Sequence, residues 1–143
     1  KPNLDKKKLT VQNNLNENTK VMADEAALKL ILTNFLSNAI KHSPKKALIN
    51  LAESSSSKGF IRLSVSDEGK GVPKKYKERV FERFYRIDKG RSSETGGTGL
   101  GLSISKNLAL MMGYSVGVEA NEPKGATFFI DIKVDEEKSI QAA

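Results

Sequence analysis

The sequence contains no cysteine and a single histidine. The absence of cysteine excludes a disulfide framework, a zinc site built on thiolates and a thiol nucleophile. One histidine cannot form a histidine-rich metal site, so any bound metal is expected to have oxygen ligands. No apolar run approaches the roughly 20 residues that cross a bilayer, and Lys1-Pro2-Asn3 resembles neither a signal peptide nor a natural initiation site. We therefore expect a soluble intracellular domain, compatible with a segment of a longer protein.

Proline and aromatic residues are also scarce. Four prolines, 11 glycines and 6% aromatic residues argue against a collagen-like or disordered chain, and 143 residues fit one domain with a buried core. Most of the net charge of +7 lies in the segment 74–91. A short basic segment between glycine-rich stretches suits a compact polyanion such as a nucleoside triphosphate better than a nucleic-acid duplex. A solvated charged loop is the alternative.

Two segments have the period of an amphipathic helix. In residues 25–42, apolar positions recur at three- and four-residue steps, Asp24 can cap the start, and Ser43-Pro44 ends the helix. The second segment covers about residues 100–112 and ends at Gly113. The apolar residues that we expect on one side of it are Leu100, Ile104, Leu108 and Met111.

Strand-like segments occupy much of the remaining sequence. Because several of them are consecutive, a mixed, mostly antiparallel sheet with helices on one face is favoured over a doubly wound parallel sheet. The segment from Asp67 to Leu100 lacks a regular pattern and is too long for an ordinary connection, so it is a candidate functional lid. The predicted strands are Lys7–Asn14, Lys20–Ala23, Ala47–Ala52, Phe60–Ser66, Tyr114–Glu119 and Ala126–Val134.

Polar residues line one edge of the first predicted helix. Asn34, Asn38 and Lys41 are spaced four and three residues apart and therefore share a face. Amide oxygens and an ammonium group suit a Mg²⁺-nucleotide, whereas an ordinary solvated face is the alternative. His42 follows this edge without a neighbouring acid, so we interpret it as a packing or ligand-rim residue rather than a base or phosphoacceptor.

Two glycine-rich segments carry further candidate binding groups. Asp67–Pro73 places an acid and two glycines after a strand, so that backbone can approach a flat ligand while the carboxylate accepts from an exocyclic amine. A simple acidic turn is the alternative. Gly96–Leu102 opens the second helix with bare N–H groups, which favours phosphate binding. It is not a Walker-type loop, and a dinucleotide fingerprint, with Glu119 as its acid, is disfavoured because Arg91–Thr95 is not an apolar strand.

Four segments together carry a resemblance to a known family. In chain order they are Asn34–Pro44 (NFLSNAIKHSP), Asp67–Pro73 (DEGKGVP), Val80–Arg86 (VFERFYR) and Gly97–Leu102 (GTGLGL). They resemble the N box, first glycine box, phenylalanine box and second glycine box of the ATP-binding catalytic domain of two-component sensor histidine kinases. Gyrase, heat-shock chaperone and mismatch-repair ATPases belong to the same superfamily. The resemblance implies an α+β fold, a two-layer α/β sandwich of the Bergerat type, with a mobile ATP lid at about 73–96. The sequence itself predicts a tail or linker at 135–143.

The resemblance also implies a site for ATP and Mg²⁺. Asn38 would ligate Mg²⁺, and Asp67 would accept from the adenine amine. The implied catalytic residues, which would position the metal or contact the phosphates, are Asn34, Lys41, Arg86 and Arg91. Further nucleotide contacts are implied for His42, Gly69, Gly71, Val72, Gly97, Thr98, Gly99, Leu100, Gly101, Leu102 and Thr127.

The implied activity is transfer of the γ-phosphoryl group of ATP to a histidine on a separate dimerisation and phosphoacceptor domain. Hydrolysing members of the superfamily carry Glu where this chain has Asn34, and an amide cannot act as a base on water, which favours transfer over hydrolysis. No phosphoacceptor helix precedes the domain in this sequence, so we expect the acceptor helices elsewhere in the full-length kinase and a response regulator downstream. The alternative is a nucleotide-binding regulatory module, a degenerate kinase or an anti-sigma-like domain, whose lid is recognised by a protein partner.

The expected setting follows from the same resemblance. We expect the isolated domain to be monomeric, with neither nucleic acid nor direct membrane contact. The implied location is cytoplasmic, either in a soluble protein or in the cytoplasmic portion of a membrane-bound sensor.

Overall fold

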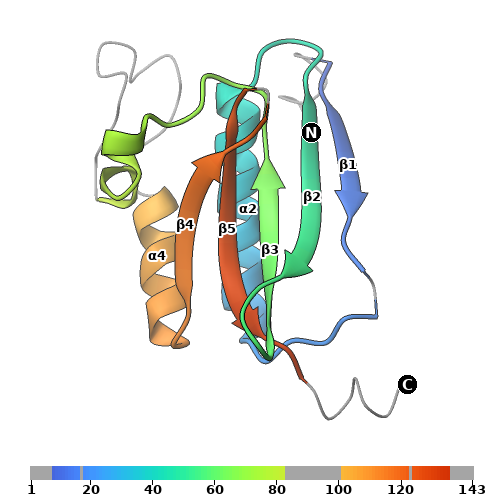
Figure 1. Ribbon diagram of the computed structural model, residues 1–143, viewed down its shortest axis with the longest axis vertical. Helices are drawn as coiled ribbons and strands as arrows, with labels where there is room; N and C mark the ends of the chain where they lie inside the picture. Colours follow the sequence, from blue (N-terminus) through green and yellow to red (C-terminus); the bar gives the residue numbers. More distant parts are fainter. Residues whose placement is uncertain (1–7, 17, 83–100, 123, 136–143) are drawn as a thin grey trace.

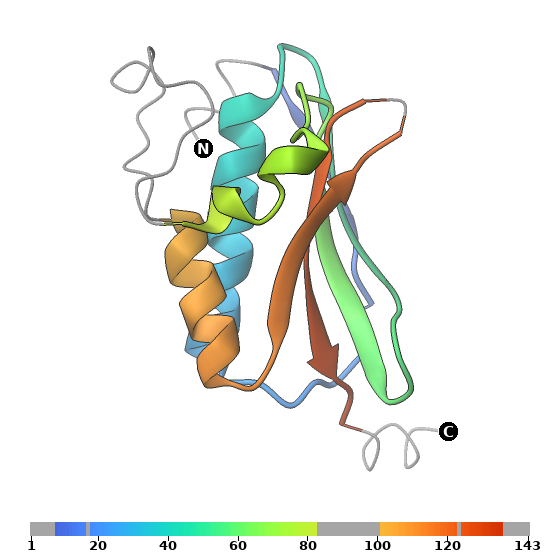
Figure 2. The same cartoon turned by 60° about the vertical axis from the view of Figure 1, so that its left-hand side comes forward.

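The computed structural model describes residues 8–16, 18–82, 101–122 and 124–135. Within these residues five strands form one sheet in the order β1-β2-β3-β5-β4, and helices lie on one of its faces (Figures 1 and 2). No helix in this part of the chain is long and apolar enough to cross a bilayer. The elements are β1 (Thr10–Asn14), α2 (Glu25–His42), β2 (Leu48–Ser55), β3 (Phe60–Ser66), the 3₁₀ helices η1 (Lys74–Tyr76) and η2 (Arg79–Phe81), α4 (Gly101–Met111), β4 (Ser115–Ala120) and β5 (Ala126–Lys133).

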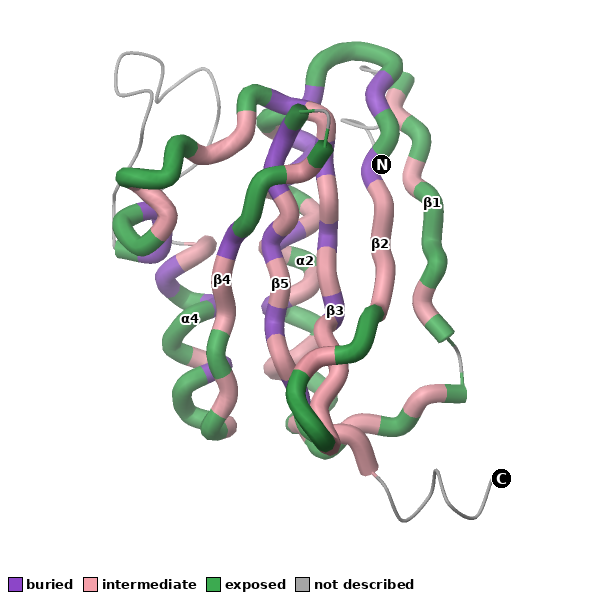
Figure 3. The backbone as a smooth tube through the Cα atoms, viewed as in Figure 1, coloured by how far each residue is buried: buried purple, intermediate pink, exposed green. Residues whose placement is uncertain are grey.

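The sheet contains both kinds of strand pairing. β1 pairs with β2 in parallel, whereas the pairs β2–β3, β3–β5 and β4–β5 are antiparallel. Burial alternates along β5, where Ala126, Phe128, Ile130 and Ile132 belong to the core and the residues between them are only partly buried (Figure 3). This arrangement confirms the predicted two-layer fold with a mixed, mostly antiparallel sheet and helices on one face.

Helix α2 packs on the sheet through an apolar stripe. Ile31, Phe35 and Ala39 recur every four residues and are at most 1% exposed, and the Phe35 ring centroid lies 5.8 Å from that of Phe128 on β5. Asp24 caps the first turn through its side chain, as predicted. Since each large apolar side chain contributes about 1.5–3 kcal/mol when fully buried, packing rather than helix propensity stabilises α2.

The buried face of α4 differs from the prediction. Ile104 is 41% exposed and Met111 is 83% exposed, whereas Ser105 and Ala109 are fully buried. Helix α4 packs side by side with α2 (Figure 2), and small side chains allow two helices to approach closely. The expected apolar side was therefore wrong for Ile104 and Met111, whereas Leu108 is partly buried against the core and Leu100 lies outside the described residues. Ser105 is buried at the contact with α2, where its hydroxyl accepts from Asn34.

The predicted strand Lys20–Ala23 does not form. Only Val21 makes an isolated bridge, to the residue that follows β5. Hydrogen bonds to the Glu53 side chain on β2 hold the residues before it instead. The backbone amide of Asn16 donates to the Glu53 carboxylate at 2.8 Å, and the Thr19 hydroxyl donates to it at 2.9 Å. These bonds give the segment fixed partners without a strand ladder.

Candidate nucleotide-binding site

The polar edge of α2 meets the first turn of α4. The Asn34 side-chain amide, Nδ2, donates to the Gly101 carbonyl at 3.1 Å and to the Ser105 hydroxyl at 3.2 Å. The Ser105 hydroxyl in turn donates to the Gly101 carbonyl at 3.0 Å. Because Nδ2 is engaged with α4, the amide orientation of Asn34 is fixed, and its Oδ1 has no hydrogen-bond partner among the described residues. The structure therefore brings Asn34 and Gly101 together, as a shared site requires.

Asn38 lies one turn after Asn34 on the same side of α2. It is partly buried and forms no hydrogen bond in the part of the chain that the structure describes. No buried side-chain nitrogen or oxygen in that part lacks a partner, so the polar atoms of Asn38 are open to solvent. Lys41 and His42, which follow on the last turn, both have polar or electrostatic interactions of their own. Asn38 thus offers an accessible amide oxygen to a hard cation.

Asp67 is a buried carboxyl group at the end of β3. It is 2% exposed, and its Oδ1 accepts from the Gly69 amide at 2.8 Å and from the Ala126 amide at 3.2 Å. Burial raises the pKa of the Asp67 carboxyl above its usual range, while these two amides and the charge of His42 oppose that rise. Its Oδ2 has no hydrogen-bond partner among the described residues and keeps only slight contact with solvent, because the whole residue is 2% exposed and no fully buried polar side-chain atom there is unpaired. One carboxylate oxygen is therefore available to a ligand.

The glycines after Asp67 are required by close backbone packing. A Cβ at Gly69 would lie 2.3 Å from the His42 carbonyl oxygen, at the end of α2. Gly71 has a φ of +79°, and a Cβ there would lie 2.8 Å from the Gly125 carbonyl oxygen. Their predicted contact with a flat ligand stays a prediction. The structure shows that they admit the backbone of α2 and of the β4–β5 turn, because a side chain would clash with carbonyl groups there.

The β4–β5 turn also binds the backbone of Asp67. The Asn121 side chain donates to the Asp67 carbonyl at 2.7 Å, and the Asp67 amide donates to the Ala126 carbonyl at 2.9 Å. Gly125 has a φ of +108°, and a Cβ there would lie 1.9 Å from the Asp67 carbonyl oxygen. On the other side, the Glu68 carboxylate accepts from the Leu48 amide at 2.7 Å. Sequence reasoning identified the turn but not these contacts, which depend on the pairing of distant strands.

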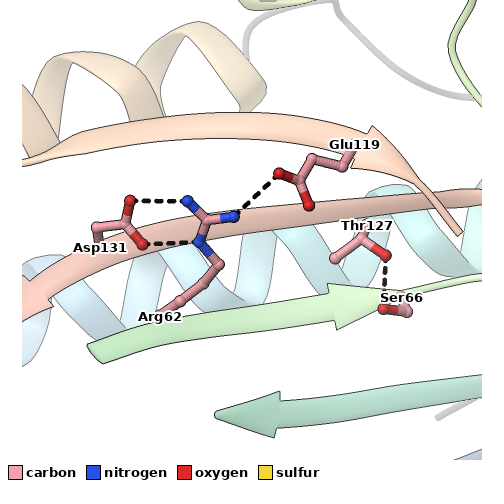
Figure 4. A network of polar contacts seen from close by, with 5 residues as sticks. All are labelled: Arg62, Ser66, Glu119, Thr127 and Asp131. Carbon is pink, nitrogen blue, oxygen red and sulfur yellow. Dashed lines mark hydrogen bonds and ion pairs between the residues drawn. The ribbon is translucent and has the colours of Figure 1, made fainter. Parts of the chain in front are cut away.

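Thr127 does not reach this site. It pairs with Ser66, and its hydroxyl lies 2.8 Å from the Ser66 hydroxyl on the face of the sheet opposite to the helices (Figure 4). Asp67 directly follows Ser66, the last residue of β3, and Ala126 directly precedes Thr127 in β5, so both face the other way. On the same outer face, Arg62 binds Asp131 at 2.8 Å and Glu119 at 3.1 Å. The predicted nucleotide contact of Thr127 is not supported, and Glu119 has an ion-pair partner rather than the role of a ribose acid.

The remaining predicted site residues fall into two groups. Val72 and Leu102 are partly buried and pack against the hydrophobic core. The positions of the second glycine-rich segment up to Leu100, and those of the predicted lid from residue 83 onward, lie outside the described residues. These positions are Arg86, Arg91, Gly97, Thr98, Gly99 and Leu100.

Helix α2 connects the two parts of the candidate site. At its C-terminal end, the His42 carbonyl of α2 lies against the loop Asp67–Pro73, which is called the Asp67 loop below. Near its middle, α2 contacts α4 through Asn34. The end of α2, the end of β3 and the β4–β5 turn lie together at the upper end of the molecule in Figure 1. From Asn34 to His42 the helix rises about 12 Å, at 1.5 Å per residue. A ligand with an amine at one end and anionic groups at the other fits this spacing.

Comparison with known proteins gives the family of the chain. Residues 23–136 match the family described as "Histidine kinase-, DNA gyrase B-, and HSP90-like ATPase". The chain belongs to this family. Members of this family are ATPase domains, so the chain is an ATP-binding domain. The family predicted from the four sequence motifs is thereby confirmed.

Relatives of this ATPase domain include sensor histidine kinases. The sensor histidine kinase WalK of Bacillus subtilis (strain 168) is 38% identical over 119 residues, which cover 82% of the chain and 20% of WalK. The sensor-like histidine kinase SenX3 of Mycolicibacterium smegmatis is 41% identical over 113 residues, which cover 79% of the chain and 29% of SenX3. The chain thus spans less than a third of these curated relatives.

Solved structures of histidine kinases share the fold of this ATPase domain. Full-length ShkA in complex with AMPPNP has a TM-score of 0.77 and 32% identity, and the match covers 93% of the chain and 27% of ShkA. A nucleotide-free catalytic domain of histidine kinase ThkA has a TM-score of 0.76 and 27% identity, covering 92% of the chain and 84% of that domain. The predicted α/β sandwich is therefore that of histidine kinase catalytic domains.

Proposed function

We propose that the chain binds ATP with Mg²⁺ and presents the γ-phosphoryl group for transfer to a histidine of a separate dimerisation and phosphoacceptor domain. The observation that carries this proposal is the buried Asp67 with its free Oδ2 at one end of α2, and the Asn34–Asn38 edge against α4 further along the helix. Asp67 would accept from the adenine amine, and the phosphates would lie along the amide edge toward Gly101 and Lys41.

The donor set fits Mg²⁺. Asn38 has accessible polar atoms, and Asn34 has an amide oxygen with no partner among the described residues, so both can face a hard cation or its water ligands. Mg²⁺ would neutralise the negative charge of the phosphates, and Lys41 would contribute a second positive charge beside them. The arginines proposed for the γ-phosphate are Arg86 and Arg91, which belong to the predicted lid, residues 73–96.

The environment of Asn34 supports transfer to a protein rather than hydrolysis. Its side chain is an amide, which cannot remove a proton from water. Its Nδ2 donates to the Gly101 carbonyl, a contact that a carboxylate could not form because it has no donor. The chain therefore provides no general base at this position, and the catalytic contribution that we propose is positioning and charge neutralisation.

The proposed partners are the phosphoacceptor helices of the same full-length kinase and a response regulator downstream. ThkA has been solved in complex with the response regulator protein TrrA, and that structure matches with a TM-score of 0.74 at 25% identity, covering 96% of the chain and 37% of ThkA. We propose a single catalytic domain that acts as a monomer in the cytoplasm. Incubation with Mg-ATP and a separate acceptor domain should label a histidine. Nucleotide binding without a labelled histidine would instead favour a regulatory module.

Asp67→Asn tests the adenine end of the site. The new Oδ1 can still accept from Gly69 and Ala126, but an amide N–H replaces the free carboxylate oxygen and opposes the adenine amine. We expect affinity for AMPPNP to fall at least roughly tenfold, while affinity for the inosine analogue, which has an acceptor in place of the amine, is kept or raised. Calorimetric titration with both analogues measures the change. Equal loss for both would contradict the role of Asp67.

Gly101→Ala tests the phosphate end of the site. A Cβ at this position would lie 3.8 Å from Asn34 Cγ, which is an ordinary contact, and alanine favours a helix by up to about 1 kcal/mol over glycine. The melting temperature should therefore stay the same or rise. If phosphates lie against the first turn of α4, the methyl group crowds them, and we expect roughly tenfold weaker binding of Mg-AMPPNP. Unchanged affinity by calorimetry would exclude phosphate contact at Gly101.

A further inference from the structure

The bonding between Asp67 and Ala126 departs from a regular antiparallel ladder. Asp67 and Ala126 lie opposite each other, next to the Ser66–Thr127 pair of the antiparallel ladder. At this position two residues normally exchange both backbone N–H···O bonds. One of the two bonds is present, from the Asp67 amide to the Ala126 carbonyl at 2.9 Å. The Ala126 amide does not return to the Asp67 carbonyl but donates to the side-chain oxygen Oδ1 at 3.2 Å. The carboxylate has taken the place of its own backbone carbonyl as acceptor.

Asn121 supplies the donor that this exchange leaves missing. The Asp67 carbonyl is in a buried residue, and an unpaired buried carbonyl costs free energy. The Asn121 side chain donates to it at 2.7 Å from the β4–β5 turn, and the Asn121 amide donates to the Gly125 carbonyl at 3.1 Å, which holds the turn in place. Each acceptor of Asp67 therefore has its own donor: the Ala126 backbone amide donates to the carboxylate, and the Asn121 side chain donates to the backbone carbonyl.

We propose that Asn121 is a positioning residue for base recognition, which acts by keeping the Ala126 amide on Asp67 Oδ1 so that Oδ2 stays directed at the ligand. Without the Asn121 donor, the Asp67 carbonyl competes for the Ala126 amide, and the ladder closes in its regular form. Oδ1 then loses one of its two donors, and the carboxylate is free to rotate away from the orientation that leaves Oδ2 without a partner. This inference rests on the proposed role of Asp67 as acceptor of the adenine amine.

The test compares the preference for adenine in matched variants. Asn121→Ala removes the donor, and Asn121→Asp keeps the shape of the side chain but cannot donate to the carbonyl. The control is Glu122→Ala, because Glu122 is exposed in the same turn. Dissociation constants for AMPPNP and its inosine counterpart are measured by calorimetry for each folded variant, with Asp67→Asn alongside.

We expect both Asn121 variants to lose roughly tenfold in AMPPNP affinity and little in affinity for the inosine analogue. The adenine preference ratio, which is the dissociation constant of the inosine analogue divided by that of AMPPNP, should therefore fall. Glu122→Ala should keep the wild-type ratio. A purely structural role would weaken both nucleotides equally, and that result would overturn the proposal. A wild-type ratio in the Asn121 variants, together with a lost preference in Asp67→Asn, would also overturn it while leaving the proposed function intact. A wild-type ratio in Asp67→Asn would show that the assigned role of Asp67 is wrong. That result would overturn both the proposed adenine contact of Asp67 and the inference about Asn121.

Discussion

Gly125→Ala is expected to lower the free energy of unfolding by about 3 kcal/mol or more and to abolish nucleotide binding. Gly125 has a φ of +108°, which an L side chain rarely adopts, and its Cβ would lie 1.9 Å from the Asp67 carbonyl oxygen and 2.9 Å from the Glu68 Cα. These atoms are backbone, so no side-chain rotation relieves the clash. The turn or the Asp67 loop must move, and either movement breaks the bonds that orient Asp67.

The control for this substitution is Gly113→Ala. Gly113 also has a positive φ, +84°, but nothing lies within 4 Å of its Cβ position. Its replacement should cost about 1–2 kcal/mol from backbone conformation alone and leave nucleotide affinity unchanged. Urea denaturation measures the loss in free energy of unfolding for each variant. The additional loss in Gly125→Ala is the cost of the clash with the Asp67 and Glu68 backbone. Equal stability losses in the two variants would mean that the β4–β5 turn and the Asp67 loop are not packed as described.

Asn38→Ala is expected to abolish Mg²⁺-dependent nucleotide binding, with a loss in affinity of ~100-fold or more. Asn38 offers an accessible amide oxygen on the edge of α2, and alanine has none to offer the cation. The fold should be unaffected, since α2 is held by its buried stripe and alanine is the better helix former.

The measurement for Asn38→Ala is calorimetric titration with AMPPNP in the presence of Mg²⁺ and in its absence. We expect the variant to lose the gain in affinity that Mg²⁺ gives the wild type. Asn107→Ala is the matched control, because Asn107 is an exposed asparagine on α4. It should bind as the wild type does. Retained Mg²⁺-dependent affinity in Asn38→Ala would contradict the assignment of the metal ligand.

Local sequence signals were sufficient for α2 and insufficient for α4. In α2 the apolar period, the Asp24 cap and the terminating Ser43-Pro44 all indicate the same helix, and the structure agrees with each of them. In α4 the fully buried positions include Ser105 and Ala109, whereas Ile104 and Met111 are exposed and Leu108 is only partly buried against the core. A hydrophobic pattern cannot show this, since the partner helix lies far away in the sequence.

The same limit applies to the site. Asp67 and Asn34 could be identified from the sequence because each belongs to a local motif, whereas Asn121 acts across 54 positions and is brought to Asp67 only by strand pairing. Thr127 shows how sharp the requirement is, because a shift of one residue along a strand moves a side chain to the opposite face. Ala126 and not Thr127 has the orientation that faces Asp67.

The bond from Asn34 to the Gly101 carbonyl has a consequence for how such a domain could change its chemistry. A glutamate at this position would supply a base for water, but it would also set a negative oxygen against a carbonyl and remove a link between two helices. Gain of hydrolysis would thus be coupled to loosening of the helical layer. In a descendant of this sequence that became a hydrolase, we would therefore expect changes in α4 along with the change at residue 34.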